Sequence, residues 1–93
     1  MKVFWSARSL QDLRRITDHI RKDNPSAAAR LAKKIFDGAI GLERMSFRGR
    51  VGGETDTREL VYTGTPYIAV YRVVGEQVRI LRIRHAAQDW PRR

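Results

Sequence analysis

Few side chains in this sequence could transfer a proton near neutral pH. The chain has two histidines, His19 and His85, and imidazole is the side chain that titrates closest to that range. Glu54, in a glycine-containing stretch, is a further candidate base. The absence of cysteine excludes thiol catalysis, disulfides and thiolate metal sites, and no metal-ligand spacing, phosphate-binding glycine loop or nucleophile elbow is present. We therefore expect neither a cofactor nor a metal.

Cations dominate the charge of the chain. Lysine and arginine number 19 against 10 acidic residues, which gives a net charge of +9, and 15 of the 19 cations are arginine. A guanidinium group pairs bidentately with phosphate or carboxylate and stacks on flat rings, whereas an ammonium group acts mainly as a point charge. This bias favours nucleic acid or an acidic protein segment as partner. A basic surface that is only solvated is the alternative.

The N-terminal half predicts a strand followed by a helical hairpin. Residues 2–5 are mostly β-branched or aromatic, as in strands, and Ser6 can cap a helix. From residue 7 to 22 apolar side chains recur at three- and four-residue steps, which predicts an amphipathic helix with the stripe Leu10, Leu13, Ile16 and Ile20. Asn24 and Pro25 end this helix and begin a second at about Ser26. Its apolar stripe reaches Met45, and Gly38 and Gly41 weaken it locally.

The C-terminal half predicts an antiparallel meander. After an exposed loop over residues 47–57, three segments are typical of strands: 58–62, 66–74 and 77–84. Gly64-Thr65 and Gly75-Glu76 separate them and suit two-residue hairpin turns. We therefore expect an α+β fold: an N-terminal strand, a helical hairpin and a three-stranded antiparallel meander, with the helices packed on one face of the sheet. Residues 1–93 are expected to form a single domain.

These turns predict a strand register. The second hairpin places Val73 opposite Val78, Tyr71 opposite Ile80, Ala69 opposite Arg82 and Tyr67 opposite Arg84, and the first places Arg58 opposite Tyr71. One sheet face would then gather Arg58, Tyr67, Tyr71, Arg82 and Arg84. The other would carry Ile68, Val70, Leu81 and Ile83, with Arg72 and Arg79 near the hairpin tip and His85 at the far end. The helices can cover only one face, so the second should be a binding surface; the pattern leaves open which face that is.

The order of elements, the size and the basic charge resemble those of the RelE/ParE toxin superfamily. The segments that carry the resemblance are Thr57-Arg58-Glu59-Leu60-Val61, Gly64-Thr65-Pro66-Tyr67, Val70-Tyr71-Arg72-Val73 and His85-Ala86-Ala87-Gln88-Asp89-Trp90-Pro91. It implies a toxin of a type II toxin–antitoxin module, neutralised by a cognate antitoxin that folds around it. An acidic antitoxin segment would match the arginines, and a toxin–antitoxin hetero-oligomer is expected.

The resemblance implies two possible activities: RelE-like cleavage of messenger RNA on the ribosome, or ParE-like poisoning of DNA gyrase. In a RelE-like enzyme the catalytic residues would be His85 for proton transfer and Arg58 and Arg82 as phosphate clamps, with Glu54 as a possible base. In either form the cations and the aromatic side chain that would contact the target or nucleic acid are Arg58, Arg72, Arg79, Arg82, Arg84 and Trp90.

Two departures favour the ParE-like activity. RNA-cutting relatives tend to carry an arginine in the middle strand, at a position that corresponds roughly to Ile68 here, and isoleucine cannot stabilise a phosphate. They also often place a tyrosine in the C-terminal segment, where this chain has Trp90, which cannot transfer a proton. The alternatives are the messenger RNA endonuclease and a non-toxic relic that binds only nucleic acid or antitoxin; a sequence-specific DNA-binding protein is weaker still.

No stretch of the sequence has the length and hydrophobicity of a membrane span, and the N-terminus lacks the apolar core of a signal peptide. A cytoplasmic protein that does not bind membranes is the expectation.

Overall fold

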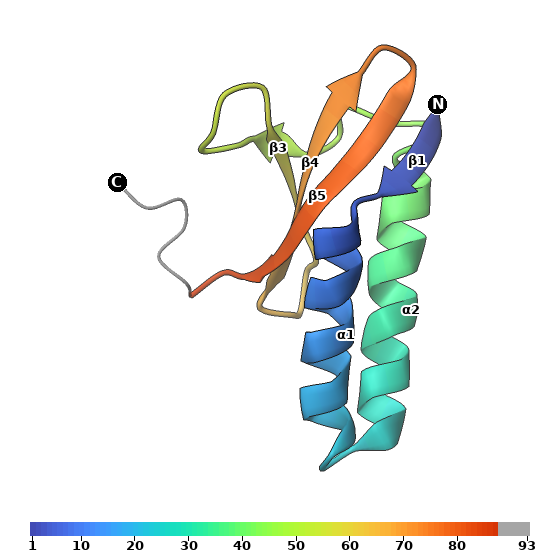
Figure 1. Ribbon diagram of the computed structural model, residues 1–93, viewed down its shortest axis with the longest axis vertical. Helices are drawn as coiled ribbons and strands as arrows, with labels where there is room; N and C mark the ends of the chain where they lie inside the picture. The colour runs from blue at the N-terminus through green and yellow to red at the C-terminus, as the bar shows by residue number, and fades with distance from the viewer. Residues whose placement is uncertain (88–93) are drawn as a thin grey trace.

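A mixed five-stranded sheet and a helical hairpin make up the computed structural model, which describes residues 1–87 (Figure 1). The elements in chain order are β1 (Lys2–Trp5), α1 (Ala7–Arg21), α2 (Pro25–Gly41), β2 (Arg50–Val51), β3 (Arg58–Val61), β4 (Tyr67–Val74) and β5 (Gln77–His85). The strand order is β1-β5-β4-β3-β2, with β1 parallel to β5 and the other pairs antiparallel. The predicted α+β class is confirmed. The stretch predicted as one exposed loop contains β2, which pairs with β3.

Local capping determines where the two helices begin. The Ser6 side chain accepts a hydrogen bond from the Ser9 N–H at the start of α1, and Asn24 accepts one from the Ala27 N–H at the start of α2. Pro25 occupies the first helical position of α2, where its missing N–H is no loss. The three residues between the helices allow them to return side by side as an antiparallel pair (Figure 1).

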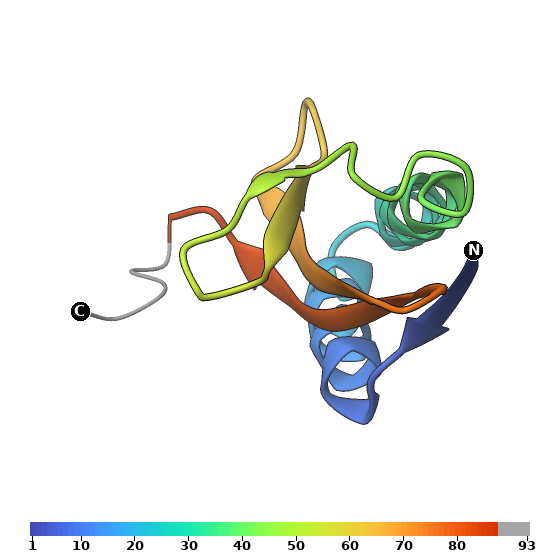
Figure 2. The ribbon, with the colours of Figure 1, turned by 90° about the horizontal axis from the view of Figure 1, so that it is seen from above.

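The core lies between the helices and one face of the sheet, as predicted. It gathers side chains from α1, from three strands and from α2, including the residues that directly follow α2 and β3: Leu13, Ile35, Ala39, Leu42, Leu60, Tyr62, Ala69, Tyr71, Val78, Ile80 and Ile83, with Val3 and Trp5 of β1 packed against them. Figure 2 shows the loop after β2 projecting on the side of the molecule away from α2. On α1 the buried side chains also include Ser9, Asp12 and Thr17, which the apolar stripe did not predict, whereas Leu10 is exposed.

A bulge in β5 corrects the predicted register. Val73 does face Val78 and Tyr71 faces Ile80, but Val70 faces Arg82, so Leu81 is an extra residue on β5. Beyond it Ala69 faces Ile83 and Tyr67 faces His85, and not Arg82 and Arg84 as predicted. Because alternate residues of a strand point to opposite faces, Arg82 and Arg84 belong to the face opposite to the core. The predicted cluster of Arg58, Tyr67, Tyr71, Arg82 and Arg84 on one face is therefore wrong.

Gly38 allows the ring of Tyr62 to lie directly on α2. A Cβ atom at residue 38 would stand 2.5 Å from Tyr62 Cε1, and the Tyr62 hydroxyl is fixed because it donates to the Ile35 carbonyl at 2.8 Å. At Gly41 of the same helix a Cβ would meet only the flexible end of Arg48, at 3.5 Å. The two glycines of α2 therefore differ in their packing, although both weaken the helix intrinsically.

We expect Gly38→Ala to lower the free energy of unfolding by about 1–2 kcal/mol, because overpacking against a buried ring outweighs the gain in helix propensity. Gly41→Ala should leave that free energy unchanged or raise it by up to about 1 kcal/mol. Urea unfolding followed by circular dichroism would measure both. Equal effects of the two substitutions would contradict a specific role for the Tyr62 contact.

Candidate functional site

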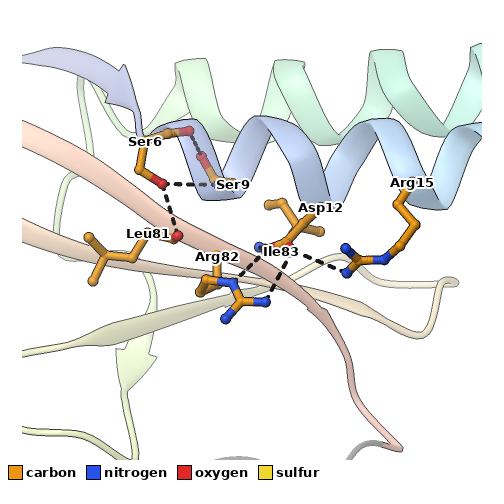
Figure 3. Close-up of polar contacts among 7 residues, drawn as sticks. All are labelled: Ser6, Ser9, Asp12, Arg15, Leu81, Arg82 and Ile83. Carbon is orange, nitrogen blue, oxygen red and sulfur yellow. Dashed lines mark hydrogen bonds and ion pairs between the residues drawn. The ribbon is translucent and has the colours of Figure 1, made fainter.

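Helix α1 completes the edge of β5 where β1 ends. The last pair between β1 and β5 is Trp5 with Ile80, and beyond it the Ser6 N–H donates to the Ile80 carbonyl at 3.0 Å. The Ser6 hydroxyl donates to the Leu81 carbonyl at 2.9 Å, and Asp12 Oδ2 accepts from the Ile83 N–H at 3.0 Å (Figure 3). The side chains of Ser6, which caps α1, and of Asp12 thereby satisfy backbone groups in the bulged part of β5, beyond the end of β1.

Asp12 is also the acid partner of Arg82. Its carboxylate accepts from Arg82 Nε at 2.8 Å and Nη2 at 3.1 Å, and from Arg15 Nη2 at 3.2 Å (Figure 3). Burial raises the pKa of Asp12, which is only 2% exposed, but the hydrogen bonds from Arg82 and Ile83 and the attraction to Arg82 outweigh it. The net pKa lies below the ordinary value, and the pKa of Arg82 is raised chiefly by its hydrogen bonds to Asp12. Arg82 is thus held at the junction of α1 and β5.

A second ion-pair group lies on the sheet face opposite to the core. Arg84 Nη2 donates to Glu59 Oε2 at 3.3 Å, and Arg50 Nε of β2 donates to Glu59 Oε1 at 2.9 Å. Burial raises the pKa of Glu59, yet the hydrogen bonds from Arg50 and Arg84 bring it below its ordinary value. Glu59 and Arg84 are 6% and 8% exposed, so this group links three strands within the structure and presents little of Arg84 to a ligand.

Arg58 precedes Glu59 on β3 and lies opposite Tyr71 of β4. Its Nη1 donates to the carbonyls of Gly49 at 2.8 Å and Phe47 at 3.2 Å, and its guanidinium lies 4.9 Å from the centre of the Phe47 ring. These contacts hold the segment before β2 against β3. An open groove of about 650 Å³ runs from here to the β4–β5 turn; its lining includes Phe47, Val51, Arg58, Arg72, Val73 and Val74. Arg72 pairs across the strands with Arg79, so the groove has a cationic end.

His85 is the last residue of β5 and faces Tyr67, the first residue of β4. Its ring meets the Tyr67 ring edge-on, with centroids 5.4 Å apart, and its Nδ1 accepts from the Ala87 N–H at 3.0 Å. His19 lies on an exposed face of α1, and a pocket of about 330 Å³ includes both histidines, which the sequence did not reveal. The helical period places His19 one turn beyond Arg15; only the packing of α1 on β5 brings both beside His85.

The residues named as catalytic for RNA cleavage do not gather at one point. Glu54 and Arg82 line a common cleft of about 440 Å³ with Ser6, Ala7, Arg8, Val70 and Leu81. Arg58 and His85 face Tyr71 and Tyr67, which are four residues apart on β4, so their backbones are separated by roughly 13 Å along the strand. Trp90 lies outside the described residues.

Within residues 1–87 no group of three or more histidine and carboxylate side chains is arranged to hold a metal ion. In the same part of the chain neither helix has the length and hydrophobicity to cross a membrane.

Comparisons with known proteins place the chain among bacterial toxins. A family model described as the ParE toxin of the type II toxin-antitoxin system parDE matches residues 3–90. A putative toxin, Y4kP of Sinorhizobium fredii, is 40% identical over 97% of this chain and 93% of its own length. Toxin RelE2 of Caulobacter vibrioides is 41% identical over 94% of this chain and 97% of its own length.

Two solved structures resemble the fold. A chain of the chromosomal ParDE toxin–antitoxin system from P. aeruginosa superposes with a TM-score of 0.84 at 27% identity, covering 91% of this chain and 95% of the other. A chain of the intact E. coli RelBE toxin–antitoxin complex superposes with a TM-score of 0.58 at 18% identity, covering 94% and 98%. The second likeness concerns the fold alone.

Proposed function

Because this chain belongs to the ParE toxin family of type II toxin–antitoxin systems, we propose that it arrests growth by binding DNA gyrase and stalling it with its DNA broken. In this proposal the toxin acts stoichiometrically in the cytoplasm and cuts no nucleic acid itself. The observation that carries it is the separation of the side chains that RNA cleavage would require. His85 faces Tyr67 and Arg58 faces Tyr71, so they lie four residues apart along β4, on the two different strands that flank it.

Metal-free RNA cleavage requires an acid, a base and cations around one phosphate. Here Arg82 is bound bidentately by Asp12, and Arg84 is almost fully buried beside Glu59. Releasing either guanidinium would remove from a buried carboxylate one of its cationic partners, which is energetically expensive. Arg82 and Arg84 of β5 therefore stabilise the fold through ion pairs. This role is consistent with a toxin that acts by binding its target.

Two further observations support the ParE-like form. Ile68, at the position where the resemblance would place a phosphate-binding arginine in RNA-cutting relatives, is 3% exposed and forms part of the packed middle strand. The structural likeness to the P. aeruginosa ParDE chain is also greater than that to the RelBE chain.

The surface that we propose for the target is the groove between the segment before β2 and the β4–β5 turn. It combines exposed apolar side chains, Phe47 and Val51, with the cations Arg58 and Arg72, and Arg79 lies next to Arg72. Apolar area rimmed by arginine is typical of protein interfaces. Of the six residues predicted to contact the target, Arg82 and Arg84 are therefore withdrawn from the proposed surface, and Trp90 stays a prediction.

Neutralisation would come from an acidic antitoxin that folds on binding and forms a hetero-oligomer with the toxin. The net charge of +9 favours such a partner. Exposed apolar side chains on and after α2, Phe36, Ile40 and Met45, offer area for it to cover. Folding on binding allows one segment to cover several such patches.

A ribosome-dependent messenger RNA endonuclease is the second candidate. Relatives named Toxin RelE1 and Toxin RelE2 support it, as does the cleft that Glu54 shares with Arg82. A toxin-like protein that only binds nucleic acid or antitoxin is the third.

The test is a pair of assays on the purified protein: gyrase supercoiling, and cleavage of a messenger in programmed ribosomes, each with His85→Ala and Arg72→Glu alongside. We expect inhibition of gyrase that His85→Ala changes by less than about twofold, because no proton transfer is involved. Arg72→Glu should weaken it by tenfold or more, about 1.4 kcal/mol, because it reverses charge at the proposed surface.

The endonuclease predicts the opposite pattern. Messenger cleavage that falls by about 10²-fold or more in His85→Ala, the scale of losing a general acid or base, would overturn the gyrase proposal. Inactivity in both assays would favour the relic.

A further inference from the structure

The pocket that includes both histidines lies between the C-terminal half of α1 and the ends of β4 and β5. Its lining comprises Arg15, Ile16, His19, Tyr67, Ile83, Arg84 and His85. We propose that this pocket binds the phosphate group of a nucleotide, with the base against its apolar wall. The proposal does not depend on the toxin's cellular target.

The side chains around the pocket are hydrogen-bond donors with positive or neutral charge. Arg15, His19 and Tyr67 can each donate to a phosphate oxygen, and none of the residues within 1–87 that line the pocket is a carboxylate. The His85 Nδ1 accepts a hydrogen bond from the Ala87 N–H, which helps to fix the ring at the edge of the pocket. A site with several donors and no acidic side chain favours an anion over a cation.

The acidic side chains on the same helix are already paired. Asp12 binds Arg82 and the Ile83 N–H, and it uses only Nη2 of Arg15. Asp18 pairs with Arg21 and Arg14 on the exposed side of α1. The Arg15 guanidinium has five N–H donors, so donors remain for a ligand while its contact with Asp12 holds the side chain in place.

Shape favours a nucleotide over a bare phosphate. The volume of about 330 Å³ lies at the small end of the range for organic ligands, roughly 300–1,000 Å³. Ile16 and Ile83 contribute apolar surface, and Tyr67 is held edge-on against His85. Aromatic and apolar surfaces of this kind receive the flat face of a base, while the cations receive the phosphate. The hydrogen-bond donors and the apolar surface of Ile16 and Ile83 together favour a nucleotide as the ligand.

The pocket also stands apart from the proposed target groove. Tyr67 and His85 lie at one end of the β4–β5 pair, whereas Arg72 and Arg79 lie next to the turn at the other end. Binding in the pocket can therefore be measured without the target and without occupying the groove.

The experiment uses the whole chain and its two imidazoles as reporters. Long-range ¹H–¹⁵N spectra would record His19 and His85 while adenosine 5′-monophosphate, adenosine or an oligonucleotide with hydroxyl ends is added at constant salt. The variants are His19→Gln and Arg15→Gln, and Lys2→Gln on β1 is the control that also removes one positive charge. The spectrum of each variant establishes that it is folded.

We expect adenosine 5′-monophosphate to shift both imidazole signals saturably, and adenosine to bind at least about tenfold more weakly because it lacks the charged group. Arg15→Gln and His19→Gln should each weaken nucleotide binding by about tenfold, and Lys2→Gln by less than about twofold. An oligonucleotide that binds more tightly than the monophosphate would identify backbone phosphates as the natural source; binding of the monophosphate alone would identify a free nucleotide. Shifts that do not saturate, or an equal loss in Lys2→Gln, would overturn the proposal.

Discussion

Asp12→Ala is expected to lower the free energy of unfolding by about 3–5 kcal/mol, the range for removing one partner of a buried ion pair. The substitution leaves the Ile83 N–H without its acceptor and removes both hydrogen bonds to Arg82. A domain of this size is stabilised by roughly 5–15 kcal/mol in total, so the loss is a large share. Chemical denaturation at pH 7 would measure it.

Asp18→Ala is the matched control, because Asp18 is a carboxylate on the same helix whose ion pairs with Arg14 and Arg21 are exposed. It should cost less than about 1 kcal/mol. Similar losses in the two variants would show that Asp12 has no special role at the α1–β5 junction.

Acidification offers a second measure of the same contact. The pKa values of Asp12 and Glu59 lie below their ordinary values of 3.8 and 4.5, so the folded state holds these protons less tightly than the unfolded chain. Their stabilising contribution is present above those values and is lost as the pH falls through the lower folded-state pKa values. The decline of stability below about pH 4 should be shallower in Asp12→Ala than in the unsubstituted protein.

Gly49→Ala is expected to lower the free energy of unfolding by about 3 kcal/mol, at the upper end of overpacking effects. A Cβ atom there would lie 2.7 Å from both Cε1 and the hydroxyl of Tyr71, and 2.8 Å from the Glu59 carbonyl oxygen. Tyr71 is fully buried, and its hydroxyl donates to the Ser46 carbonyl and accepts from the Gly49 N–H, both at 2.8 Å. Neither the ring nor the backbone of β3 can give way easily.

A double-mutant cycle with Tyr71→Phe tests this cause. Tyr71→Phe alone should cost about 1–3 kcal/mol, because it leaves a buried N–H and a buried carbonyl without a partner. If the hydroxyl is the obstacle, the two substitutions together should cost at least about 0.5 kcal/mol less than their sum. Strict additivity would assign the cost of Gly49→Ala to the contacts that phenylalanine leaves in place, with ring atom Cε1 and the Glu59 carbonyl.

Patterns within short stretches of sequence were sufficient to predict the helices and most of the strands. Ser6 and Asn24 mark the helix starts, the helical period identifies Leu13 as a core residue, and the Gly75 turn places Val73 opposite Val78. Each of these features depends on neighbours in the chain. Gly75 has a φ of +60°, the conformation that a two-residue hairpin turn demands and that side chains disfavour.

The register beyond Tyr71 depended on contacts between distant segments. The residues around Leu81 contain no pattern that predicts a bulge. The hydrogen bonds that accompany the bulge come from a distant segment, because Ser6 and Asp12 bind the backbone of β5 there. One extra residue exchanges every later side chain between the two faces. It moved Ile83 into the core and Arg82 and Arg84 out of the predicted cluster.

The sequence by itself thus determined the toxin family, the basic character and the residue types that could contact a target, since these depend on composition and on the order of elements. Only the tertiary structure decided what each cation does. Asp12 and Glu59 lie far from Arg82 and Arg84 in the chain, and their burial binds those arginines within the fold. Packing of α1 on β5 likewise brought His19 beside His85 across more than sixty residues. The physical reason is that an arginine can bind a ligand only if folding has not already paired it with a buried carboxylate. Which carboxylate lies next to it is decided by the packing of segments that are distant in the sequence.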